Sequence, residues 1–311
     1  MCGIVGYAGR PVAQGGHPAT EVVLEGLRRL EYRGYDSAGI AVIADGAIAS
    51  RKKAGKLANL LAEIDQDPLP ESSTAIGHTR WATHGGPSDK NAHPHLADGG
   101  RLAVIHNGII ENFSPLKKSL LERGHTFLSE TDTEVAAALL GDIFNGEAAG
   151  DLTRAMQLTA SRLEGAFTLL AIHADLPGVV VAARRNSPLV VGLGEGENFL
   201  GSDVSGFIDY TKRAVELGQD QVVTITPEDY SVTDFAGNPA QGREFTVDWD
   251  AAAAEKGGYA SFMAKEIQHQ PQAVPEAQRL QHRQLGDPLA HRLGHGVAGQ
   301  QQQGEEHRAH D

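Results

Sequence analysis

The residue with the clearest chemical potential is Cys2, the only cysteine among 311 residues, which directly follows Met1. Removal of the methionine would leave one residue with both a thiol and a free α-amino group. The ordinary pKa of a cysteine thiol is about 8.5, and its thiolate is a strong nucleophile. An α-amino group has a pKa of about 7.7–8.0, so it could act as the base for its own side chain. A single cysteine is otherwise often a small buried apolar residue, and the other polar clusters must decide between these interpretations.

Arg80 and Trp81 lie between an apolar segment at residues 75–79 and the turn-forming residues 85–87. An arginine at the end of a strand can grip a carboxylate through two parallel hydrogen bonds. A structural salt bridge is the alternative, and the residues alone leave both interpretations open.

Asn107 and Gly108 follow the apolar segment 102–106. Glycine lets the backbone turn and present its N–H with no side chain in the way. A side-chain amide next to such an N–H supplies the two donors of an oxyanion hole. Asn-Gly is also a very common turn, so this pair carries little weight by itself.

Acidic and hydroxyl residues fill the segment 129–134, directly before an apolar helical pattern. Thr131 or Asp132 could cap that helix, and Glu134 would complete a capping box if Thr131 is the cap. The alternative is that an acidic side chain here holds the ammonium group of a ligand.

Five histidines at positions 78, 84, 93, 95 and 106 fall within thirty residues. Their spacing lacks the helical His-Glu-x-x-His pattern, and a second cysteine that could complete a zinc site is missing. Structural roles are therefore favoured over metal binding. Further histidines follow residue 268, with irregular spacing and a glutamine run.

The elements that would position these residues alternate between strands and helices. Period-two and apolar segments predict strands at 4–8, 40–43, 47–50, 75–79, 102–106, 167–172, 179–183, 189–192, 222–226 and 230–235, and helical patterns begin near Thr20 and cover 57–64, 115–123, 133–144 and 152–163. Asp45-Gly46 is a favoured tight-turn pair. Strands, then helices, then strands again indicate an α+β fold of stacked sheets with helices outside.

Composition narrows the class of protein. The formal net charge of −13 argues against non-specific nucleic-acid binding, which needs Lys and Arg to neutralise phosphates. The chain shows neither an apolar stretch long enough to cross a bilayer nor a signal peptide, and one cysteine fits a reducing compartment. We therefore expect a cytoplasmic protein without a membrane partner.

Six segments taken together resemble the class II glutamine amidotransferases of the N-terminal nucleophile hydrolase superfamily. Within it, they are most similar to the glutaminase half of the glutamine–fructose-6-phosphate aminotransferases. The segments are 2–6, 31–39, 80–81, 91–95, 106–112 and 129–134, and residues 187–203 form a second stretch that looks like segments of the same group. The resemblance implies a four-layer α/β/β/α sandwich of antiparallel sheets. It implies an amidotransferase domain over residues 1–245, a linker over 246–274 and a separate tail, expected to be disordered, over 275–311.

The resemblance also implies roles for individual residues. Cys2, after loss of Met1, would attack the side-chain amide of L-glutamine, with its own α-amino group as the base. The donors to the oxyanion would be Asn107 and Gly108. The α-carboxylate would bind Arg80, and the α-ammonium would bind Asp132. The remaining contacts would come from Thr83 and His84, from Trp81 in a closing loop, and from Arg33 near the nucleophile. This chemistry uses neither a metal nor a cofactor.

Longer members of the resembled group continue with two isomerase modules, which bind fructose 6-phosphate and use the ammonia, and they are expected to form homodimers. Residues 275–311 resemble none of that sequence, so we expect this chain to act as a glutaminase only. Three alternatives remain: a non-catalytic regulatory domain, a metallohydrolase built from the central histidines, and an amidotransferase serving another acceptor.

Overall fold

The computed structural model describes residues 2–248 and residues 264, 267, 268 and 270. The chain divides into two compact units, residues 1–255 and 256–311, and nearly all of the described residues belong to the first. The expected tail at 275–311 and most of the expected linker at 246–274 lie outside the described residues. The domain boundaries at 245 and 274 therefore stay predictions.

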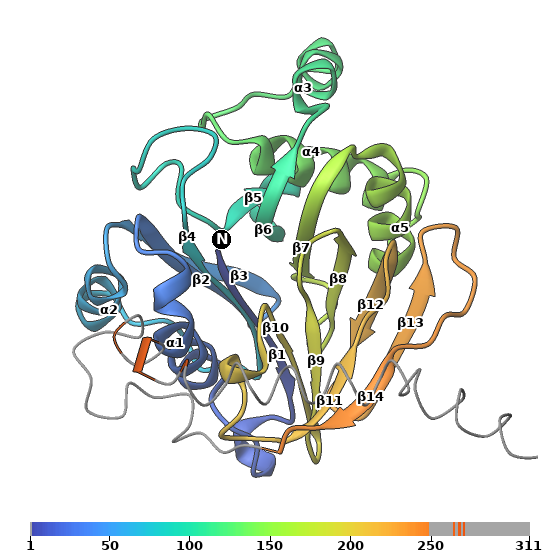
Figure 1. The fold of residues 1–311 in the computed structure, drawn as a ribbon. Coiled ribbons are helices and arrows are strands. Elements are labelled where there is room, and N and C mark those ends of the chain that lie inside the picture. Colours follow the sequence, from blue (N-terminus) through green and yellow to red (C-terminus); the bar gives the residue numbers. More distant parts are fainter. Residues whose placement is uncertain (1, 249–263, 265–266, 269, 271–311) are drawn as a thin grey trace, which may run out of the picture. The chain divides into compact units, whose positions relative to one another are not determined.

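Two antiparallel sheets form the centre of the first unit (Figure 1). The eight-stranded sheet has the order β14 (Arg243–Thr246), β11 (Arg213–Glu216), β9 (Val190–Leu193), β10 (Glu197–Gly201), β1 (Gly3–Gly9), β4 (Thr74–Arg80), β2 (Ser37–Ala44) and β3 (Ala47–Ala54). The six-stranded sheet has the order β13 (Tyr230–Asp234), β12 (Gln221–Ile225), β8 (Val180–Arg185), β7 (Gly165–His173), β6 (Leu102–Ile110) and β5 (His95–Ala97).

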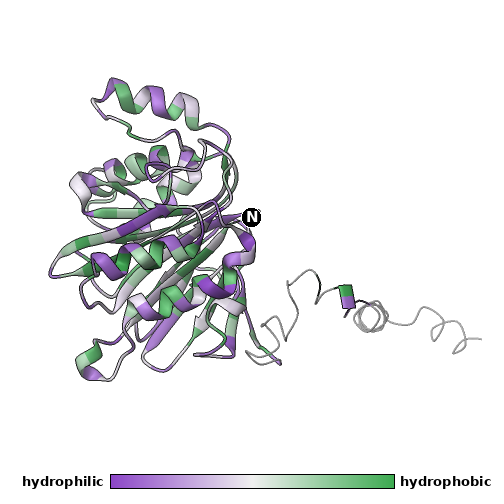
Figure 2. Cartoon of the chain, turned by 90° about the vertical axis from the view of Figure 1, so that its left-hand side faces the viewer, coloured by the Kyte–Doolittle hydropathy of each residue, from purple (hydrophilic) through white to green (hydrophobic). Residues whose placement is uncertain are grey.

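Helices cover the outer face of each sheet. The eight-stranded sheet packs against α1 (Ala19–Leu30) and α2 (Leu57–Gln66), whereas the six-stranded sheet packs against α4 (Asp132–Asn145) and α5 (Leu152–Arg162). A further helix, α3 (Phe113–Glu122), lies against α4. The helices carry alternating hydrophilic and hydrophobic residues (Figure 2), as expected of helices with one face on a sheet. The predicted α+β sandwich with four layers is confirmed.

Three apolar cores separate the four layers. The middle core joins the inner faces of the two sheets, with Ile4 of β1 and Ile105 of β6 among its buried members. The outer cores lie between α1 and the larger sheet and between α4, α5 and the smaller one. Because β1 is buried along all seven residues, its apolar sequence fits a central strand covered on both faces.

Strand pairing brings distant polar residues to one edge of the sandwich. In β1, Gly3 pairs with Thr79 of β4, so Cys2 lies beside the end of β4 at Arg80. Figure 1 shows the start of β1 between β4 and β6. The predicted strand at 102–106 is too short, because β6 runs on to Ile110 and pairs there with β7. Asn107 and Gly108 therefore lie inside a strand.

Candidate active site

Cys2 is nearly buried, with 7% of its surface exposed, and lies beside Trp81. Its Sγ accepts the Trp81 backbone N–H at 3.3 Å. Burial raises the pKa of the Cys2 thiol, while the Trp81 N–H, the chain's α-amino group and Arg80 act in the opposite direction. Asp132 adds to the rise. The thiol thus needs a nearby base before it becomes a nucleophile at neutral pH.

Asn107 bonds to the main chain of Cys2. The Cys2 N–H donates to Asn107 Oδ1 at 3.1 Å, across 105 residues of sequence. The other end of this amide, Nδ2, is buried and has no hydrogen-bond partner among the described residues. A buried donor without a partner costs about 1–3 kcal/mol. Because its amide is fixed by the bond to Cys2, Asn107 keeps this donor ready for another acceptor.

Gly108 is required by its backbone conformation. Its φ is +139°, where residues with a side chain are strained. A Cβ there would lie 2.0 Å from the Ala166 carbonyl oxygen of β7. The sequence suggested that glycine is needed at position 108 to leave its N–H open to a ligand. In the structure, the close approach of β7 is by itself enough to require glycine there.

Arg80 ends β4 and is 97% buried, but it forms no ion pair within the described part of the chain. Its Nη2 donates to the carbonyl oxygens of His84 and, at 2.9 Å, of Gly85. Its Nη1 is buried and has no partner among the described residues. Burial lowers the pKa of Arg80, while the nearby Cys2, Asp132 and Asp36 raise it. The alternative of a structural salt bridge thus finds no support in this geometry.

Asp132 is the first residue of α4, and Thr131 is the N-cap, whose hydroxyl accepts the Glu134 N–H at 3.3 Å. Glu134 bonds back to the N–H groups of Leu128 and Ser129. The carboxylate of Asp132 therefore does not serve as the helix cap. It is buried, and its Oδ2 accepts the Ile110 N–H at 2.9 Å. The helix N-terminus favours its negative charge.

Trp81 and His84 border this site. Trp81 is half-exposed and meets Tyr35 edge to face, with ring centroids 5.6 Å apart. The next residue, Ala82, donates its N–H to Asp36 Oδ2 at 2.8 Å, which holds the start of this loop. His84 Nδ1 lies 3.8 Å from Asp132 Oδ2.

The other two expected site residues lack a direct contact with this group. Thr83 is exposed and has no hydrogen bond among the described residues. Arg33 lies with its Nη2 3.9 Å from Asp203 Oδ2. The next residue along the chain before Asp203, Ser202, donates to the Cys2 carbonyl oxygen at 3.4 Å. Their proposed contacts with a ligand stay predictions.

Sequence reasoning gave no role to Asn91 or Ser187, although both lie in segments that carried the resemblance. Asn91 donates to the Gly86 carbonyl oxygen at 2.9 Å and accepts the Glu130 N–H at 3.0 Å, which ties the loop after β4 to the start of α4. Ser187 Oγ donates to the Asn107 carbonyl oxygen at 3.3 Å. These side chains meet their partners through contacts between separate segments of the chain. The local sequence pattern therefore could not assign a role to them.

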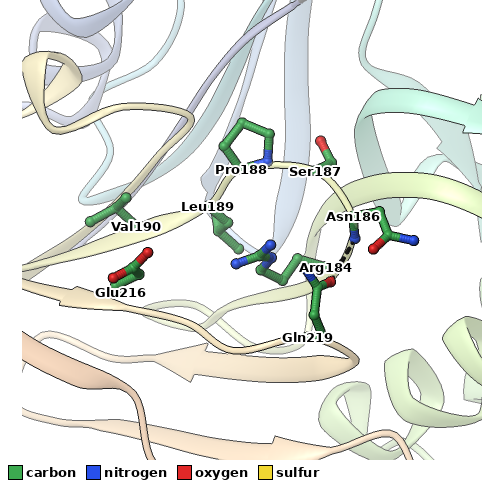
Figure 3. A pocket seen from close by; sticks show the side chains of 8 residues that line it. All are labelled: Arg184, Asn186, Ser187, Pro188, Leu189, Val190, Glu216 and Gln219. Atoms are coloured by element: carbon green, nitrogen blue, oxygen red, sulfur yellow. Dashed lines mark hydrogen bonds between the residues drawn. The ribbon is translucent and has the colours of Figure 1, made fainter. Parts of the chain in front are cut away.

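Ser187 also borders a separate pocket of about 340 Å³ (Figure 3). Its lining residues are Arg184, Asn186, Ser187, Pro188, Leu189, Val190, Glu216 and Gln219, and none of them is a predicted site residue. The Arg184 side chain points into it (Figure 3), and its Nη1 donates to the Leu217 carbonyl oxygen at 2.6 Å.

Four of the five central histidines are buried together beside the site. The His78 and His93 rings lie 4.2 Å apart, and the His93 and His95 rings lie 4.9 Å apart. Burial lowers the pKa of His78 to about 3, and it lowers the pKa values of His93, His95 and His106 as well. Within the described residues, no group of three His, Cys, Asp or Glu side chains is arranged to hold a metal ion.

In the part of the chain that the structure describes, the search for a long apolar helix able to cross a bilayer found no candidate.

Comparison with known proteins gives one family and a set of longer relatives. Residues 65–237 match the glutamine amidotransferase domain, a range that includes Arg80, Asn107 and Asp132 and begins after Cys2. The chain is 70% identical over 275 residues to a glutamine–fructose-6-phosphate aminotransferase (isomerizing) from Corynebacterium diphtheriae, covering 88% of this chain and 44% of the relative. It is 53% identical over 284 residues to the same enzyme from Mycobacterium tuberculosis, covering 89% and 45%. The chain thus spans less than half the length of these relatives.

Solved structures give the same architecture. A glutamine phosphoribosylpyrophosphate amidotransferase from B. subtilis superposes with a TM-score of 0.62 at 24% identity, over 76% of this chain and 50% of that one. An allosteric regulatory enzyme of purine biosynthesis superposes with a TM-score of 0.63 at 26% identity, over the same shares. Because the first of these structures is only 24% identical to this chain, it supports the fold alone.

Proposed function

Because this chain belongs to the glutamine amidotransferase domain family, we propose that it hydrolyses the side-chain amide of L-glutamine with Cys2 as the nucleophile. The observation that carries the proposal is the buried Nδ2 of Asn107, which lacks a partner among the described residues although its own Oδ1 bonds Cys2. A donor held beside a nucleophile without an acceptor suits an oxyanion that exists only during reaction.

Two opposite charges would bind the α-carbon end of glutamine. Arg80 offers Nη1 to the α-carboxylate while its Nη2 holds the loop carbonyls. Asp132 offers its carboxylate to the α-ammonium group, with one lone pair already fixed by the Ile110 N–H. The charges of Arg80 and Asp132 influence each other and Cys2, which supports a single site for a zwitterion. His84 would add a contact near Asp132.

The chemistry follows from a free α-amino group on Cys2. After removal of Met1, the amine would accept the thiol proton, and Asn107 Oδ1 would orient that amine through its present bond to the Cys2 nitrogen. Sulfur would attack the amide carbon of glutamine, and the oxyanion would bind Asn107 Nδ2 and the Gly108 N–H. The amine proton would pass to the departing ammonia and leave a γ-glutamyl thioester. Water would then attack the thioester, release glutamate and return the proton to the thiol.

The longer relatives are named for an aminotransferase reaction with fructose 6-phosphate, and we propose that this chain supplies the ammonia for such a reaction. The ammonia would serve formation of an amino sugar phosphate, with fructose 6-phosphate bound by a region that the matched part does not include. A homodimer of the complete enzyme stays a prediction. A cytoplasmic location is proposed because the Cys2 thiol must remain reduced to act.

The test is to incubate the purified chain with L-glutamine and to measure glutamate and ammonia. We expect equal amounts of both, and no product from the Cys2→Ser variant. A protein that starts at Cys2, is folded and yields no glutamate would overturn the proposal. Release of glutamate by the Cys2→Ala variant at the full rate would overturn the assignment of the nucleophile.

A further inference from the structure

We propose that three buried histidines act through two threonine hydroxyls to position Asp132 for the ammonium group of the substrate, an inference that rests on the proposed function. These side chains form a histidine–threonine network, defined as His93, His95, His106, Thr131 and Thr133. The network has no direct contact with the reacting amide, so its members are positioning residues.

The hydrogen bonds of the network converge on the two residues that flank Asp132. Thr133 Oγ1 lies 2.7 Å from His93 Nε2 and 2.9 Å from His106 Nδ1. Thr131 Oγ1 lies 2.9 Å from His95 Nε2. Both hydroxyls are buried at the start of α4, which packs on β5 and β6 (Figure 1). Asp132 is therefore fixed on both sides to strands of the smaller sheet.

The Thr133 hydroxyl constrains two imidazoles at once. It has a single proton, so it donates to one histidine and accepts an N–H from the other. The ring that accepts the hydroxyl proton must be neutral, and the other ring must present an N–H at the contacting nitrogen. Removal of the hydroxyl would leave two buried ring nitrogens without a partner, in addition to His93 Nδ1 and His106 Nε2, which have none among the described residues.

A neutral network orients Asp132 without cancelling its charge. The nearest imidazole nitrogens of His84 and His106 lie 3.8 and 3.9 Å from its carboxylate oxygens, beyond hydrogen-bond distance. Burial lowers the pKa of each network histidine, so none carries a positive charge near neutral pH. No histidine of the network therefore competes as a cation with the ammonium group of the substrate. A simple apolar core at this place would hold α4 as firmly with fewer buried polar atoms.

The chain offers a matched set of threonine variants. Thr133→Val removes the bridging hydroxyl at nearly constant volume, and Thr133→Ser keeps it. Thr159 of α5 is also completely buried, but its hydroxyl has no partner among the described residues, so Thr159→Val is the control. Binding is measured by calorimetry in a Cys2→Ala background, with L-glutamine and with its analogue that lacks the α-amino group. Steady-state kinetics are measured with Cys2 intact.

Thr133→Val should weaken binding of L-glutamine about tenfold, raise KM similarly and leave kcat within about threefold. Its affinity for the analogue should stay within about twofold, because the analogue has no ammonium group. Thr133→Ser should restore binding, and Thr159→Val should change neither ligand. Equal loss for both ligands, or unchanged binding of L-glutamine, would overturn the proposal.

His93→Gln provides the same comparison if Thr133→Val does not fold, because it removes one imidazole and leaves the hydroxyl in place. Again we expect a selective loss of affinity for L-glutamine. An equal loss of affinity for both ligands would contradict the role of the network. Failure of the parent chain to bind or hydrolyse L-glutamine would overturn the proposed function instead, so the two failures are distinguishable.

Discussion

Replacement of Asn107 by alanine should slow catalysis strongly while changing stability little. The kinetic loss is that of one oxyanion donor, about 10²–10³-fold in kcat, or about 2.7–4 kcal/mol of transition-state stabilisation. Two effects on folding oppose each other. Loss of the bond between Cys2 N and Asn107 Oδ1 costs about 0.5–1.5 kcal/mol, whereas removal of the buried, unpartnered Nδ2 returns about 1–3 kcal/mol. We expect the net change in the free energy of unfolding to lie between a loss of about 0.5 kcal/mol and a gain of about 2.5 kcal/mol.

Asn198 supplies the matched control for this experiment. It is equally buried, but its Nδ2 donates to the carbonyl oxygens of Thr226 at 2.8 Å and Asp229 at 3.3 Å. Asn198→Ala should lower the free energy of unfolding by about 1–3 kcal/mol and leave kcat unchanged. Asn107→Asp keeps an acceptor for the Cys2 nitrogen but loses the donor, so it should lose as much kcat as Asn107→Ala.

The assays are steady-state glutamate release and unfolding in urea, followed by circular dichroism. The oxyanion role would be refuted if Asn107→Ala raised KM alone, or if it behaved like Asn198→Ala by losing stability with kcat intact. Either result would make Asn107 a structural residue and leave its unpartnered Nδ2 without a catalytic meaning.

The same geometry supports three further predictions. Arg80→Lys keeps a charge but cannot hold the loop carbonyls and the α-carboxylate through two separate guanidinium nitrogens, so KM for L-glutamine should rise at least about tenfold while kcat changes less. A change in kcat alone would contradict its binding role. Gly108→Ala should cost more than about 3 kcal/mol of unfolding free energy, because of its φ and the Ala166 carbonyl oxygen, whereas Gly46→Ala at an open turn should cost about 1–2 kcal/mol; similar losses would disprove this difference. Burial holds the pKa of His78 at about 3, below the ordinary 6.5, so the unfolded chain takes up a proton first as pH falls, and stability declines between about pH 6.5 and 3. Between pH 7.5 and 5.5 this residue should lower the free energy of unfolding by about 1.4 kcal/mol. In urea unfolding, the free energy of the His78→Phe variant should fall by about 1.4 kcal/mol less over the same pH range.

Local pattern predicted the elements with strong apolar runs. The strands around Ile4 and Ile76 and the turn at Asp45-Gly46 were expected, and both turn residues have positive φ as a tight hairpin requires. The strands β5, β10, β11 and β14 were not predicted. They are three to five residues long, and β10 begins with Glu197 and Asn198, so its place between β1 and β9 depends on pairing with distant strands.

The end of β6 shows why a turn signal failed. Asn-Gly normally ends a strand, and the strand was predicted to stop at residue 106. In the structure the strand continues to Ile110. Gly108 pairs with Phe167 and Ile110 pairs with Gly165, although Gly108 has a positive φ. Tertiary pairing outweighed the local preference.

The sequence predicted which residue types form the site better than how they are held. The resemblance named Cys2, Asn107 and Arg80. Strand register places Cys2 beside Arg80, and a hydrogen bond between the two sheets joins it to Asn107. The resemblance did not indicate which end of the Asn107 amide faces Cys2, since a bond across 105 residues leaves no local trace. The ion pair of Arg33 with Asp203 was likewise not indicated by the sequence, and its place near the nucleophile stays a prediction.

The central claim is that Cys2, freed of Met1, forms the covalent bond to the substrate. The most direct measurement is mass spectrometry of the purified chain before and after incubation with an electrophilic glutamine analogue. We expect an intact mass that lacks Met1 and a single adduct on the N-terminal peptide at Cys2, blocked by excess L-glutamine. A retained methionine in a protein that still hydrolyses glutamine, or an adduct on any residue other than Cys2, would contradict it.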